Sequence, residues 1–119
     1  MAYDNPIMAT YRFPAISVVS AATLGYIVGP AGKSGRVLSV AYVITTGVTV
    51  AASNLIIGVS GTTNAYATTP VAVAAAATGG NAMTIGATGT IPADSVVTVG
   101  SAGGATAGAV DALVTIGWY

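Results

Sequence analysis

The sequence contains no cysteine and no histidine, and only six of its 119 residues are charged. Without cysteine it forms neither a disulfide framework nor a thiolate nucleophile, and without histidine it lacks an imidazole base and the usual zinc ligands. Three basic residues are too few to neutralise the phosphates that dominate nucleic-acid affinity, so we expect no nucleic-acid partner. These absences exclude most familiar active sites. We therefore expect no enzyme, no cofactor and no metal site.

The scarcity of charge also concerns the surface. The chain is 54% hydrophobic and 5% charged, with a net charge of zero. Disordered chains have the opposite composition, so we expect one folded domain. A freely diffusing domain normally uses surface charge to stay soluble. Two explanations are open: other chains cover much of the surface, or Ser, Thr and Asn side chains keep it hydrated.

Neither a membrane span nor a secretory signal is predicted. No charged residue lies between Val37 and Ala93, but Thr, Ser, Asn, Gly and Pro interrupt the stretch. No run reaches the roughly 20 consecutive apolar residues that a membrane helix needs. The first six residues lack the basic patch and long apolar run of a signal peptide. We expect no membrane partner.

The apolar residues recur mostly at every second position, and Val, Ile, Thr and Tyr predominate, which is typical of β-strands. The clearest strand is C-terminal, where Val110, Val114 and Trp118 share one face. About eight short strands separated by Gly- and Pro-containing turns predict an all-β domain, either a closed barrel or an antiparallel two-sheet β-sandwich. The other predicted strands are 16–21, 24–28, 36–45, 54–60, 65–68, 82–85 and 95–99.

Three segments depart from this pattern. Residues 71–77, Val-Ala-Val followed by four alanines, fit a short helix or an edge strand equally well. The Gly-rich run 100–108 lies between two strong strands and is expected to be a hairpin loop. Residues 1–14 contain Asn5-Pro6 and Phe13-Pro14, and the residue before a proline is extended. We expect an extended N-terminal arm over 1–14 that reaches a neighbouring subunit, and a sandwich domain over 15–119.

One short motif resembles a phosphate-binding loop. Gly32-Lys33-Ser34 matches the end of that motif, but Ile27 stands where its first glycine is required. A strand rather than a helix is predicted to follow, so no helix N-terminus would face a phosphate. A hairpin turn is the better interpretation.

The carboxylate side chains are Asp4, Asp94 and Asp111. They form no calcium-binding loop pattern, and no His or Lys stands close in sequence to tune the pKa of Asp94 or Asp111. We interpret Asp94 and Asp111 as solvated or locally hydrogen-bonded groups rather than a catalytic pair.

The aromatic residues support two interpretations. Tyr42 and Trp118 lie on apolar strand faces, which favours burial in the core or, for Trp118, between subunits. Tyr119 falls on the opposite face and is an interface candidate. Exposed tyrosines on a β-sandwich can also form a platform for sugar rings, a role that Tyr66 and Tyr119 could fill.

Three stretches together resemble the small capsid decoration, or cement, proteins of tailed bacteriophages: residues 28–40, residues 90–99 with the Ile-Pro-Ala-Asp turn, and residues 108–118. The resemblance implies a β-sandwich or jelly-roll module on the outer surface of the virion capsid. It implies that the module staples major capsid protein subunits and associates with itself, as a trimer or a dimer. It supplies no catalytic residue.

The arm and the scarce charged residues supply the expected contacts with other subunits. The competing hypothesis is a glycan- or receptor-binding β-sandwich module on a virion or cell surface. The interface candidates are Tyr3, Asp4, Pro6, Tyr11, Arg12, Phe13, Lys33, Arg36 and Tyr119.

Overall fold

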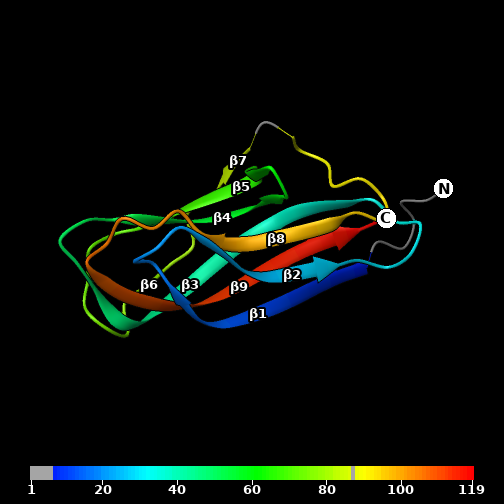
Figure 1. Cartoon of the computed structure of the whole chain (residues 1–119). Helices are drawn as coiled ribbons and strands as arrows, with labels where there is room; N and C mark the ends of the chain where they lie inside the picture. The colour runs from blue at the N-terminus through cyan, green and yellow to red at the C-terminus, as the bar shows by residue number, and fades with distance from the viewer. Residues whose placement is uncertain (1–6, 87) are drawn as a thin grey trace.

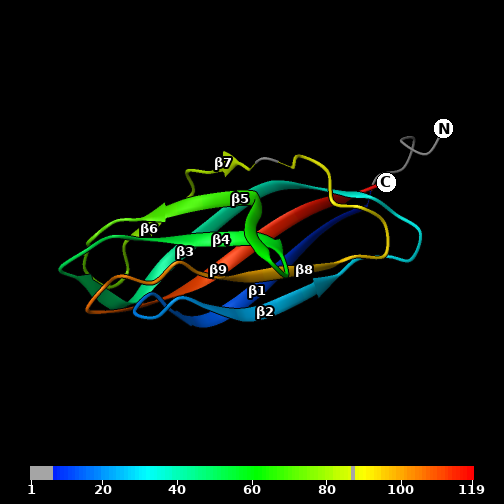
Figure 2. The same cartoon turned by 45° about the horizontal axis from the view of Figure 1, so that its top comes forward.

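The computed structural model describes residues 7–86 and 88–119, which form two stacked antiparallel β-sheets (Figure 1). The four-stranded sheet, called sheet A below, has the order β1-β9-β3-β6, and the five-stranded sheet B has the order β2-β8-β4-β5-β7. Turning the molecule brings sheet B in front of sheet A (Figure 2). The strands are β1 (Ile7–Ser17), β2 (Ala22–Val28), β3 (Gly35–Thr49), β4 (Ser53–Val59), β5 (Thr62–Val71), β6 (Gly79–Gly80), β7 (Thr84–Ile85), β8 (Val96–Ser101) and β9 (Ala107–Trp118).

The strand order is that of a jelly roll. The hairpin β4–β5 is innermost in the chain, and the pairs β3–β6, β2–β8 and β1–β9 enclose it in turn. Nesting the pairs in this way, with alternate pairs in opposite sheets, is how a jelly roll closes two sheets on one core. The predicted antiparallel β-sandwich with jelly-roll topology is therefore confirmed, with nine strands among the described residues rather than about eight.

The core lies between the sheets, and β9 is central to sheet A because β1 and β3 pair with its two edges. Its alternate residues from Val110 to Trp118 are buried, as the period-two pattern predicts. Trp118 is 1% exposed, which confirms the core position expected for it. Its indole N–H donates a hydrogen bond to the Tyr11 hydroxyl at 3.1 Å, and its ring fills the space beside Gly29 and Gly35.

The prediction of an N-terminal arm needs correction over residues 7–14, the part of it that the structure describes. Residues 7–14 are extended, but they belong to β1 and pair with β9 of the same chain, from Ile7 opposite Trp118 to Phe13 opposite Ala112. β1 continues to Ser17, so no boundary falls at residue 14. The reason is the alternation of Ala9, Tyr11 and Phe13, which pack against the core from the edge of sheet A. Residues 1–6 lie outside the described residues.

Residues 72–77 are neither helix nor regular strand. They follow the end of β5 at Val71, and Ala74 forms an isolated bridge with Val48 of β3. Backbone hydrogen bonds from Val48 N to Ala74 O and from Ala77 N to Ile44 O, at 3.0 and 2.7 Å, hold the segment against β3. These tertiary hydrogen bonds override the helix propensity of alanine.

Two predicted hairpins are crossings between the sheets instead. β8 and β9 lie in different sheets, so the Gly-rich segment between them passes from sheet B to sheet A. The segment 29–34 likewise carries the chain from β2 to β3. The turn itself is confirmed: Lys33 N donates to Pro30 O at 3.2 Å, and Gly32 has a φ of 73°, which suits the glycine position of a type II turn.

Candidate interaction surfaces

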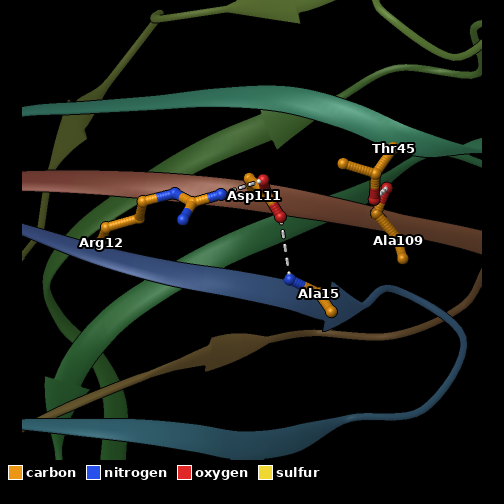
Figure 3. A network of polar contacts seen from close by, with 5 residues as sticks. All are labelled: Arg12, Ala15, Thr45, Ala109 and Asp111. Carbon is orange, nitrogen blue, oxygen red and sulfur yellow. Dashed lines mark hydrogen bonds and ion pairs between the residues drawn. The ribbon is translucent and has the colours of Figure 1, made fainter.

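The outer face of sheet A carries an ion pair across β1 and β9 (Figure 3). Arg12 Nη2 lies 2.7 Å from Asp111 Oδ2, and the Ala15 N–H donates to Asp111 Oδ1 at 3.0 Å. Ala15 has a φ of 56° and lies in the irregular part of β1 between Phe13 and Ile16. Both bonds lower the pKa of Asp111, and the bond from the Ala15 N–H contributes more than the bond from Arg12. Asp111 is therefore a locally hydrogen-bonded group, as the sequence indicated, and it anchors the bulge of the edge strand.

A second polar region lies at the end of the sandwich where β9 finishes. The Gly32 N–H donates to Asp94 Oδ1 at 2.9 Å, which joins the β2–β3 and β7–β8 connections. The Ser95 hydroxyl donates to the Pro92 carbonyl at 2.7 Å. Ser34 and Tyr119 exchange two backbone hydrogen bonds, at 2.9 and 3.0 Å. Asp94 thus closes a turn, as expected, and Lys33 lies in the same set of turns.

The structure does not gather the predicted interface residues on one surface. Tyr11 and Phe13 are half-buried and pack against the core, whereas Lys33 and the half-buried Tyr119 lie at the polar end. Arg12 and Arg36 lie on the outer face of sheet A, opposite Leu113 and Gly117 of β9. The remaining candidates, Tyr3, Asp4 and Pro6, lie outside the described residues.

The outer face of sheet B carries no charged residue in its strands, and the sequence did not single it out. Ile27 and Val97 are buried, so their neighbours along β2 and β8 point outward. Tyr26 and Val28 are 66% and 67% exposed, and Val96, which pairs with Val28, is 46% exposed. None of the five strands of this sheet contains a charged residue. The available signal was the charge-free stretch of the sequence, which by itself does not say which side chains face outward.

A shallow depression lies beside this face. It has a volume of about 280 Å³, and no titratable side chain lines it. At about this size it falls just below the range of typical small-molecule pockets, and its lining side chains are aliphatic or carry a hydroxyl group. Its lining residues are Ala21, Ala22, Thr23, Ile56, Thr63 and Ser101.

Within residues 7–86 and 88–119, no three or more Asp, Glu, His or Cys side chains lie close enough together to hold a metal ion. In the same ranges no helix has the length and apolar character needed to cross a membrane. No protein-family model, no curated protein and no solved structure gives a significant match to this chain.

Proposed function

We propose that the chain is a structural virion protein, a capsid decoration or cement protein on the outer surface of a head. It binds across major capsid protein subunits, associates with itself as a trimer or dimer, and stabilises the head. Jelly rolls are common in viral capsids, although they also occur in lectins, so the fold alone does not decide between these functions.

The uncharged outer face of sheet B carries the proposal. Exposed, contiguous apolar surface on a small domain marks a site that another chain covers. The interiors of stable protein interfaces are depleted of charged residues and enriched in tyrosine, which is the composition around Tyr26, Val28 and Val96. A protein that is permanently seated in this way needs no surface charge to remain dispersed.

The test uses heads assembled without the protein. Purified chain is added, the heads are pelleted, and the bound copies are counted before and after saturation. We expect a fixed number of copies per head and a higher temperature of head rupture by calorimetry. Full occupancy with an unchanged rupture temperature contradicts the stabilising role, and absence of saturable binding contradicts decoration itself.

A matched pair of valines locates the contact. Val28 faces outward from sheet B, and Val43 faces outward from sheet A opposite Asp111 of β9. A neutral polar substitution is used at both positions, because a carboxylate at residue 43 would face that of Asp111. Burying an amide without hydrogen-bond partners is unfavourable, so Val28→Asn is expected to weaken binding about tenfold or more. Val43→Asn is expected to leave binding within about twofold. Equal effects of the two substitutions would contradict a contact through sheet B.

The second candidate function, glycan binding, rests on Tyr26. Tyr66 is 4% exposed and cannot stack on a sugar, whereas Tyr26 is exposed. Tyrosine rings offer an apolar face with a polar edge, which suits a pyranose. Glycan-array binding that is lost in Tyr26→Ser and kept in Tyr119→Ser would favour this function over decoration.

A further inference from the structure

One end of the sandwich consists almost entirely of alanine, valine and glycine. Four connections meet there, opposite the end marked C (Figures 1 and 2). We call this surface the apolar end. It contains no charged residue, and only Ser20, Thr78 and Thr106 among its side chains are polar. Its segments are 18–21 between β1 and β2, 50–52 between β3 and β4, 72–78 between β5 and β6, and 102–106 between β8 and β9.

Several apolar side chains of this end are open to solvent. Val50 is 81% exposed, Val73 is 52% exposed and Val19 is 41% exposed. The three alanines 75–77 are exposed as well. Connections are normally rich in Asn, Asp, Ser and Pro, because those side chains hydrogen-bond to the backbone of turns. At the apolar end this role falls to two serines of the flanking strands: the Ser17 hydroxyl accepts from the Val19 N–H at 3.3 Å, and the Ser101 hydroxyl accepts from the Gly103 N–H at 2.9 Å. The exposed side chains of the four connections are mostly alanine and valine.

The opposite end shows that the composition of the whole chain does not explain this surface. There the turns contain Lys33 and Asp94, and Asp94 accepts a hydrogen bond from the Gly32 N–H. The Ser95 hydroxyl donates to the Pro92 carbonyl at 2.7 Å in the same connection. The two ends of one small domain therefore differ in polarity, which is expected when one end faces water and the other faces protein.

Backbone hydrogen bonds tie these connections to one another and to the ends of β3 and β4. The β8–β9 connection bonds to the β1–β2 connection and to the ends of β3 and β4, and the β5–β6 connection bonds to β3. A surface ordered in advance loses less conformational entropy on binding. The bonds are Ala105 N to Val18 O, Gly104 N to Val19 O, Thr106 N to Thr49 O, Ala102 N to Asn54 O and Val48 N to Ala74 O, at 2.9 to 3.2 Å.

Val50 has an unfavourable conformation as well as an exposed side chain. Its φ is 73°, and the Ala51 N–H donates to the Thr49 carbonyl at 2.9 Å across it. This is a γ-turn of the rare, strained form. A β-branched residue with positive φ is an outlier that usually marks a functional site, because Gly, Asn or Asp is the comfortable choice there. With 81% of its surface exposed, Val50 gains little packing within the chain to offset this conformation.

We infer that the apolar end is a docking surface that enters an uncharged, apolar recess on another protein chain, with Val50 at its tip. The inference rests on the proposed function, where that chain is a capsid subunit. A protein that binds across subunits needs two separate contact surfaces. The outer face of sheet B provides one, and the apolar end provides the other.

The composition and size of the apolar end favour this occupant over a lipid surface or a second copy. Surfaces that enter membranes combine Lys or Arg with long or aromatic apolar side chains, and the apolar end has neither. The two shorter dimensions of the molecule are 27 and 20 Å. The cross-section of its end is therefore about 540 Å², below the roughly 800 Å² per partner of a stable two-chain interface. A recess that also contacts the flanks of the loops provides the missing area.

The experiment compares wild-type chain with Val50→Asn and Ala76→Asp, using Ala31→Asp at the polar end as the matched control. Binding to heads assembled without the protein is measured by co-sedimentation, and the unfolding temperature of each variant by calorimetry. We expect Val50→Asn and Ala76→Asp to lower occupancy at least about tenfold, and Ala31→Asp to leave it within about twofold. Because Asn tolerates positive φ, Val50→Asn is expected to keep or raise the unfolding temperature while binding is lost.

The outcomes separate the inference from the proposed function. If Val50→Asn and Ala76→Asp bind heads as well as the wild type does, the inference is wrong and the proposed decoration function is unaffected. Failure of wild-type chain to bind heads overturns both. Sedimentation velocity of the chain alone and flotation with phosphatidylcholine vesicles test the other occupants. Self-association or vesicle binding that Val50→Asn abolishes overturns the inferred partner. Self-association that Val50→Asn leaves unchanged, without vesicle binding, supports it.

Discussion

Replacing Thr69 with valine is expected to stabilise the protein. Thr69 lies in β5 opposite Leu55 of β4, and both side chains are 0% exposed. They face the core together with Ala67 and Val71. The Thr69 hydroxyl oxygen is buried and has no hydrogen-bond partner. Valine has nearly the same shape, so the substitution removes the hydroxyl without opening a cavity.

The magnitude follows from the desolvation of that hydroxyl. A buried polar group without a partner costs about 1–3 kcal/mol, and its replacement by a methyl group recovers this free energy. For a domain of 119 residues, each kcal/mol shifts the midpoint of thermal unfolding by about 4 °C. If Thr69→Val recovers about 1–2 kcal/mol, the lower and middle part of the range of free energies, the midpoint is expected to rise by about 4–8 °C.

Calorimetry and urea unfolding of wild type, Thr69→Val and Thr10→Val provide the assay. Thr10 is an exposed control whose hydroxyl lies 3.0 Å from that of Thr115 on the outer face of sheet A. Thr10→Val is expected to change stability by less than about 1 kcal/mol. A loss of stability in Thr69→Val would refute the reasoning, since it would mean that the hydroxyl has a partner in the folded protein.

Two further substitutions test the packing and the ion pair. A Cβ at Gly35 would lie 2.5 Å from the Trp118 ring, so Gly35→Ala is expected to lose about 1–3 kcal/mol in urea unfolding. Combined with Trp118→Phe it should lose less than the sum of the two single losses, and full additivity would contradict the contact. The lowered pKa of Asp111 means that its contribution is complete above its unfolded pKa, about 4, and declines as the pH falls through the folded value. The stability difference between wild type and Asp111→Asn should therefore shrink from pH 7 to pH 2.5, and a constant difference would exclude the ion pair with Arg12 as its source.

The regular strands were predictable because their side chains report their environment directly. In β9, alternation from Val110 to Trp118 specifies which side chains enter the core, and the structure buries them. β6 was missed because Gly79 and Gly80 have no side chains that could show a pattern. They pair with Tyr42 and Val43 of β3, where a Cβ at Gly80 would lie 2.6 Å from the Tyr42 hydroxyl oxygen, so the absence of a side chain permits a contact that no local pattern shows.

The candidate surfaces were less predictable because they consist of residues far apart in the sequence. Charge and aromaticity drew attention to Tyr11 and Arg12, yet Tyr11 accepts the indole hydrogen bond of the core and Arg12 pairs with Asp111. Val50 lies in an unremarkable sequence, Thr-Val-Ala, and only its positive φ and exposure distinguish it. Neither property can be read from local composition.

The residues alone were enough to predict an all-β domain, because strand periodicity is a local property of a chain. Tertiary packing sets which sheet each strand joins and therefore which segments cross between the sheets. It turned residues 7–14 into an edge strand and brought four alanine- and valine-rich connections to one end. These outcomes depend on pairings between residues many positions apart, in which the hydrogen-bond partner and the face that becomes buried are set by the other strand.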